Sequence, residues 1–87
     1  MSKFEKLVAV LLQGTSDKNF KFTELIKLLI HLGFDTRIKG SHHIFYKNGI
    51  DEIINIQSTE NNKAKAYQVK QIREIIVKYK LLKKINE

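Results

Sequence analysis

The residues best suited to chemistry in this chain are two adjacent histidines, His42 and His43, which directly follow Gly40-Ser41. Histidine has an unperturbed pKa of about 6.5, so its imidazole can both accept and donate a proton near neutral pH. A glycine-serine turn would present these imidazoles outward, and three basic residues flank the motif: Arg37, Lys39 and Lys47. Imidazoles in a basic neighbourhood are suited to cleaving a phosphodiester bond, so we predict this chemistry for the motif.

Other kinds of site lack the residues that they need. The chain has no cysteine, which excludes disulfides and thiolate metal sites. A zinc site at His42 and His43 lacks ligands, because neighbouring side chains on a strand diverge and His31 is the only other histidine. The acidic pair Asp51-Glu52 is interpreted as solvated rather than as a magnesium site. We therefore expect neither a metal nor another cofactor.

The chain is short and basic. Its 87 residues are 43% hydrophobic, as expected for one small folded domain over residues 1–87. The net charge is +7, and residues 63–87 alone hold eight basic against two acidic residues. This asymmetry indicates a polyanion or an acidic protein as partner, the alternative being a solubilising face. With no long apolar stretch and no signal-peptide pattern, we expect a cytoplasmic protein without membrane contact.

Hydrophobic spacing predicts two helices ahead of the histidine motif, at residues 4–12 and 22–32. The first stops at Gly14, and Gly33 is suited to a left-handed cap on the second. A short polar segment, residues 15–19, joins them. We expect the two helices to pack antiparallel.

After Gly33 the pattern alternates, which predicts strands over residues 34–39, 43–46 and 51–57. Gly40-Ser41 and Lys47-Asn48-Gly49 supply the turns, and Asn-Gly is a strong hairpin signal. A last helix is predicted over residues 66–81. The order α-α-β-β-β-α predicts an α+β fold, with a three-stranded antiparallel sheet packed on one face against helices.

Strand alternation separates the two histidines. If the strand is regular, His42 shares a face with Ile44 and Tyr46, and His43 shares the other with Phe45. One face must meet the helices and the other must meet solvent or ligand. At least one imidazole should therefore be accessible.

Residues 22–81 resemble the HicA family of toxins from toxin–antitoxin modules. Four motifs in order carry the resemblance: Leu25-x-x-Leu28-Leu29, Leu32-Gly33-Phe34, Gly40-Ser41-His42-His43-Ile44-Phe45 and Gln68-Val69-Lys70-Gln71-Ile72-Arg73. HicA proteins are small domains similar to double-stranded RNA-binding domains, and they act as mRNA endonucleases neutralised by HicB antitoxins. The resemblance implies a HicA-like core at residues 22–82, preceded by an N-terminal helical extension at residues 1–21.

The resemblance also implies a catalytic histidine just after the glycine-serine turn. Family members place it at either of two successive positions, so both His42 and His43 remain candidates. The implied function is metal-free endonucleolytic cleavage of mRNA by a toxin that is monomeric when free and forms a hetero-oligomer with a HicB-type antitoxin. The third strand lacks a proline-histidine pair seen in many relatives. A non-catalytic RNA-binding module and a basic protein-interaction domain are the alternatives.

Seven residues are candidate RNA contacts: Lys39, Ser41, Lys47, Lys63, Lys65, Lys70 and Arg73. The first three could stabilise charge on a reacting phosphate. Lys63 and Lys65 precede or begin a predicted helix, where the macrodipole disfavours cations, and this suggests that they meet phosphate. Lys70 and Arg73 can share an exposed helical face. Two tyrosines of the last helix, Tyr67 and Tyr79, are expected at the edge of the core rather than as platforms for base stacking.

Overall fold

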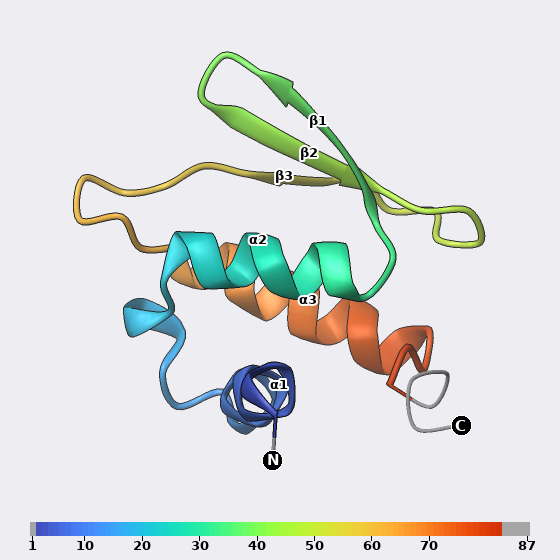
Figure 1. The fold of residues 1–87 in the computed structure, drawn as a ribbon, viewed down its shortest axis with the longest axis horizontal. Helices are drawn as coiled ribbons and strands as arrows, with labels where there is room; N and C mark the ends of the chain where they lie inside the picture. The colour runs from blue at the N-terminus through green and yellow to red at the C-terminus, as the bar shows by residue number, and fades with distance from the viewer. Residues whose placement is uncertain (1, 83–87) are drawn as a thin grey trace.

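The computed structural model describes residues 2–82, which form three layers (Figure 1). The elements in chain order are α1 (Lys3–Gln13), a 3-10 turn η1 (Asp17–Asn19), α2 (Phe22–His31), β1 (Asp35–Lys39), β2 (His42–Tyr46), β3 (Ile54–Ile56) and α3 (Ala66–Lys78). Helices α2 and α3 cover one face of the sheet, and α1 lies on their far side. The predicted α+β class and element order are confirmed, and the core from α2 to α3 has the arrangement of a double-stranded RNA-binding domain.

The sheet is an antiparallel meander in the order β1-β2-β3. Gly40 turns the chain between the first two strands with φ of +62°, a conformation that disfavours any residue with a Cβ. In the resulting register, Phe45 pairs with Thr36 on one side and with Ile54 on the other. Paired residues share a face, so this register decides which side chains of β2 point toward the helices.

The core fills the space between the sheet and the helices. Phe45 is 0% exposed and lies at its centre on β2. The other fully buried large side chains come from all three helices and from β3: Leu11, Leu25, Leu28, Leu29, Ile54, Ile56, Val69, Ile72 and Ile76. Since Phe45 faces the helices, its alternating neighbours Ile44 and Tyr46 lie on the open face of the sheet.

The third strand is shorter than predicted, because the segment before it is bound to helix α3. The backbone N–H of Asp51 donates to the hydroxyl of Tyr79, and that hydroxyl donates to the carboxylate of Glu52. Lys78 donates to the other carboxylate oxygen of Glu52 at 3.0 Å. The hydrogen bonds from Tyr79 and then Lys78 lower the pKa of Glu52 below its ordinary value. These contacts hold residues 51–52 against α3 and confine pairing to Ile54–Ile56.

Helix α1 does not pack antiparallel to α2, and that prediction was wrong. Figure 1 shows α1 nearly end-on while α2 and α3 run across the view. Arg73 of α3 accounts for this placement: its guanidinium donates to the carbonyl of Leu11 at 3.1 Å and to both carboxylate oxygens of Asp17 at 2.9 and 3.1 Å. Gly14, with φ of +72°, ends α1 at a point where a Cβ would lie 3.3 Å from the Arg73 guanidinium. The end of α1 is thus bound to α3.

Replacing Asp17 with alanine should loosen this attachment. The side chains of Arg73 and Asp17 are 20% and 19% exposed, and the hydrogen bonds to Asp17 raise the pKa of Arg73. Losing the carboxylate leaves a largely buried guanidinium with only one acceptor, so we expect about 1–3 kcal/mol less stability in urea unfolding. Asp35→Ala, at an exposed carboxylate without an ion pair in the described chain, is the matched control. Equal effects of the two changes would contradict this role for Asp17.

Candidate active site

His42 lies on the open face of the sheet and is the first residue of β2, close to the turn at Gly40. Its ring nitrogen Nδ1 is 3.1 Å from the side-chain oxygen Oδ1 of Asn55 on β3. An N–H at Nδ1 can donate to that oxygen, which leaves Nε2 as the ring nitrogen available to a ligand. The imidazole is thus both accessible and held in one orientation.

A polar cavity of about 240 Å³ adjoins this imidazole. We call it the His42 cavity, and its lining residues are His42, Asn55, Gln57, Tyr67 and Gln68. His42 lies on β2, Asn55 lies on β3 and Gln57 directly follows β3, while the first turn of α3 contributes the other two. The cavity therefore lies where the outer edge of β3 meets the start of α3.

Gln68 joins the two elements that form the cavity. It is 4% exposed, the one buried polar residue in the described chain. Its Nε2 donates to the backbone carbonyl of Asn55 at 3.2 Å, and its Oε1 accepts from the backbone N–H of Gln57 at 3.4 Å. The backbone N–H and C=O groups along the outer side of an edge strand have no partner strand. The side-chain amide of Gln68 supplies a partner for one such N–H and one such C=O. The contact positions α3 beside the cavity.

His43 has a different environment, on the face of β2 that meets the helices. Its ring packs edge-on against Phe22 of α2, with the ring centroids 5.1 Å apart. Its Nδ1 is buried and has no hydrogen-bond partner among residues 2–82. The expectation that strand alternation separates the two imidazoles is confirmed, and the accessible one is His42.

Four of the candidate RNA contacts lie near the His42 cavity or on the surface beyond it. Lys39 is the cross-strand partner of His42 and projects on the same open face. Lys65 directly precedes α3, at the end that lines the cavity, and Lys70 is exposed one turn further along. Ser41, in the turn before His42, accepts a hydrogen bond from Gln57 Nε2 at 3.1 Å. Ser41 is therefore linked to a residue of the cavity wall.

The other three candidate contacts are engaged elsewhere in the fold. Lys47 follows the far end of β2, about 16 Å along the strand from His42, and contacts the carbonyl of Gly33 at 3.5 Å. Lys63 donates to the side chain of Asn19 at 3.1 Å. The Arg73 side chain is only 20% exposed and is bound to Asp17, so the exposed helical face predicted for it is not observed. These residues do not join Lys39 around the cavity.

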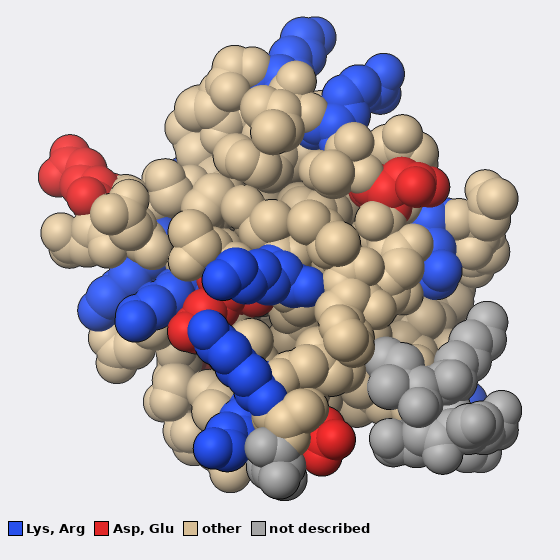
Figure 2. Space-filling model, viewed as in Figure 1, with Lys and Arg blue, Asp and Glu red and all other residues tan. Residues whose placement is uncertain are grey.

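Basic side chains are spread over the molecule rather than confined to one stripe. Figure 2 shows Lys and Arg side chains near the hairpin between β1 and β2 and, separately, over α2 and α1 and at the left and right edges, with mostly uncharged surface between the first group and the others. The concentration of lysine along the last quarter of the sequence therefore does not become one continuous patch on this face. Basic residues that can contribute to a surface at the site are Arg37 and Lys39 on the open face of β1, and Lys65 and Lys70 at the start of α3.

Comparison with known proteins adds one decisive observation. Residues 22–85 match the model of a protein family described as the HicA toxin of bacterial toxin–antitoxin modules. The chain belongs to the HicA toxin family. Membership makes it a toxin of such a module and implies an antitoxin partner. No curated protein and no solved structure matches the chain significantly.

The HicA match begins at Phe22, the first residue of α2, and so leaves α1 and η1 outside it. It includes both histidines and the whole sheet. All five lining residues of the His42 cavity lie within the matched range. The cavity is thus a feature of the HicA-like part of the chain rather than of the N-terminal extension.

Sequence reasoning missed most of the His42 cavity. Asn55 and Gln57 alternate with the buried Ile54 and Ile56, and this period of two places both polar side chains away from the core. This alternation can be seen in the sequence, but it does not reveal that α3 lies beside β3. Tyr67 was expected at the core edge and is instead 64% exposed, so that prediction was wrong. The expectation for Tyr79 is confirmed, since it is partly buried against the core.

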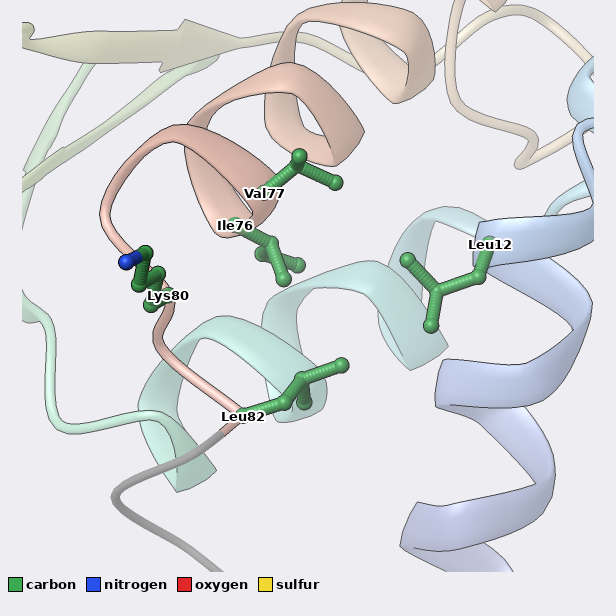
Figure 3. Close-up of a pocket in the computed structure, with 5 residues that line it drawn as sticks. All are labelled: Leu12, Ile76, Val77, Lys80 and Leu82. Carbon is green, nitrogen blue, oxygen red and sulfur yellow. The ribbon is translucent and has the colours of Figure 1, made fainter.

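A second hollow in this HicA protein, of about 350 Å³, is not suited to acid–base chemistry. Leu12 of α1, Ile76 and Val77 of α3 and Leu82 converge on it, while the amino group of Lys80 points away (Figure 3).

Among residues 2–82, no group of three His, Asp or Glu side chains could hold a metal ion. In the same range, no helix is long and apolar enough to span a membrane.

Proposed function

We propose that this HicA toxin is an endoribonuclease that cleaves mRNA without a metal ion, with His42 as its general base. The observation that supports this most directly is the hydrogen bond between His42 Nδ1 and Asn55 Oδ1. A proton held at Nδ1 leaves an unprotonated Nε2, the form of imidazole that can remove a proton from a hydroxyl group. The adjoining cavity gives a substrate access to that nitrogen.

The proposed reaction needs only the RNA, the side chains at the site and solvent water. His42 Nε2 accepts the proton of a ribose 2′-OH as that oxygen attacks the adjacent phosphorus. The new P–O2′ bond forms while the P–O5′ bond breaks, the departing 5′ oxygen takes up a proton from water, and the imidazolium of His42 returns its proton to the solvent. The products are a 2′,3′-cyclic phosphate and a free 5′-OH. Negative charge grows on the phosphate oxygens, where the ammonium group of Lys39 is available to stabilise it.

We propose a packing role for His43. Its ring contacts Phe22 on the face of the sheet covered by helices, and in the described part of the chain its buried Nδ1 has no partner that would orient it for proton transfer. A general base must lie within hydrogen-bonding reach of the proton that it removes. The exposure of His42 favours it over His43 for this task.

RNA would be held by phosphate contacts to Lys39, the cross-strand partner of His42 on β1, and to Lys65 and Lys70 at the start of α3. Single-stranded RNA loses affinity with a log–log salt slope of about −0.7 per phosphate contacted, so three contacts predict a slope of about −2. The same positive charge suits an acidic antitoxin of the HicB type, which would inhibit by covering His42. The toxin would be monomeric when free and hetero-oligomeric when inhibited.

The test is cleavage of a long single-stranded RNA in EDTA by the parent protein, beside a variant with His42→Ala and His43→Ala. We expect the parent to cleave and the double variant only to bind, as followed by gel analysis and fluorescence anisotropy. If both proteins bind RNA and neither cleaves it, the protein is a binding module. If neither binds RNA at low salt, the basic surface serves protein partners only.

A further inference from the structure

The His42 cavity combines features that the cleavage reaction alone does not require. A general base needs access to one hydroxyl group, whereas this cavity extends over about 240 Å³ beside the imidazole. Its other walls are three amide side chains and one aromatic ring: Asn55, Gln57, Gln68 and Tyr67. None of these four side chains carries a charge at neutral pH, so the cavity is suited to a neutral polar group rather than a phosphate.

Hydrogen bonds within the protein engage only part of the polar groups in this wall. Gln68 is bound through both its nitrogen and its oxygen, and Asn55 Oδ1 is bound to His42. Gln57 Nε2 donates to Ser41. Two groups make no hydrogen bond within residues 2–82: the Nδ2 donor of Asn55 and the Oε1 acceptor of Gln57. The cavity thus offers a ligand one donor on Asn55 of the edge strand β3 and one acceptor on Gln57, just after the end of that strand.

Tyr67 contributes an aromatic surface to the same cavity. Its side chain is 64% exposed on the first turn of α3, immediately before the buried Gln68. Single exposed apolar residues are common and need no explanation by themselves. Here, however, the backbone under the ring is held against β3 by Gln68, so the ring is presented at a defined place beside His42.

We propose that the His42 cavity receives one unstacked nucleobase of single-stranded RNA, next to the phosphodiester presented to His42. The base stacks on Tyr67, and its edge accepts a hydrogen bond from Asn55 Nδ2 and donates one to Gln57 Oε1. This inference rests on the proposed endoribonuclease function. A nucleobase fits because it is flat, uncharged and carries donors and acceptors on its edge, and proteins read single-stranded RNA by stacking and edge contacts of this kind.

Occupation of the cavity would position the scissile bond. The base is attached to the ribose whose chain continues through the neighbouring phosphates, so fixing the base limits where the 2′-OH can lie relative to His42. Holding reacting groups in place lowers the barrier without any added chemistry. Tyr67 is therefore a positioning residue. The effect of replacing it on the cleavage rate should depend on whether the substrate carries the base that stacks on it.

The test uses an oligonucleotide of 2′-O-methyl RNA with a single free 2′-OH, because only one phosphodiester in it can then be cleaved. The base is removed at the reactive nucleotide or at either neighbour, one position at a time. The parent, Tyr67→Ala and Tyr67→Phe are compared by kcat/KM. The matched control is Val77→Ala, which lies at the other end of α3, is 63% exposed and does not line the cavity.

We expect removal of the base at one position to lower kcat/KM of the parent by about 5- to 150-fold, the range for losing one stacked base. The same removal should have a smaller effect in Tyr67→Ala, which keeps only the edge contacts to Asn55 and Gln57, whereas Tyr67→Phe should recover the sensitivity of the parent and Val77→Ala should stay within about twofold of the parent. The proposal is overturned if Tyr67→Ala cleaves like the parent, or if it is as sensitive to base removal as the parent.

Failure of the proposed function would be recognised separately. If the parent cleaves neither the long RNA nor the oligonucleotide, the same series is measured as binding by fluorescence anisotropy. Base-dependent binding that is lost in Tyr67→Ala would support the base site in a non-catalytic protein. Binding that is independent of the base, or absent, would overturn the base site.

Discussion

Replacing His42 with alanine is expected to lower the rate of RNA cleavage in EDTA by about 10²- to 10⁴-fold, the range for a lost general acid–base group. The change should leave the fold intact, because His42 is exposed and its only hydrogen bond in the described chain joins it to the side chain of Asn55. Cleavage rates and thermal unfolding of the same preparations would separate a catalytic loss from an unfolded protein.

The matched change is His43→Phe, which keeps an aromatic ring against Phe22 and removes the buried nitrogen that lacks a partner. We expect this variant to cleave RNA at a rate near that of the parent. It should be at least as stable, because an unsatisfied buried polar group costs about 1–3 kcal/mol. Loss of cleavage in His43→Phe together with retained cleavage in His42→Ala would reverse the assignment of the two histidines.

The largest effect on stability is expected from Phe45→Ala. Phe45 is 0% exposed at the centre of the interface between the sheet and the helices, and removing such a ring costs about 3–5 kcal/mol. Small domains are stable by only about 5–15 kcal/mol, so this variant should be partly unfolded or close to unfolding at room temperature. Urea unfolding followed by circular dichroism would measure the loss.

The neighbouring residue Tyr46 provides the control, since it is 42% exposed on the opposite face of β2. We expect Tyr46→Ala to cost no more than about 1 kcal/mol. The contrast tests the register that places His42 outside, because a shift by one residue would exchange the two faces. A larger loss for Tyr46→Ala than for Phe45→Ala would place His43, not His42, on the open face.

Local sequence signals predicted the existence and order of the elements well, and their extents less well. Apolar spacing located α2 within one residue of its end, and Gly33 has the expected positive φ of +94°. The third strand was predicted too long, because alternation continues through residues 51–53 although Tyr79 and Lys78 hold this segment against α3. The crossing of α1 was missed for a similar reason: Arg73 and Asp17 are 56 residues apart in the chain.

Strand alternation alone requires one of the two imidazoles to face outward, since adjacent strand residues point to opposite faces of the sheet. It could not determine which one, because Ile44, Phe45 and Tyr46 are all apolar and either face of β2 could have met the helices. The packing of α2 and α3 against Phe45 decided it. The cavity beside His42 likewise depends on tertiary structure alone, because Asn55 and Gln57 meet Tyr67 and Gln68 only when α3 docks against the edge of β3.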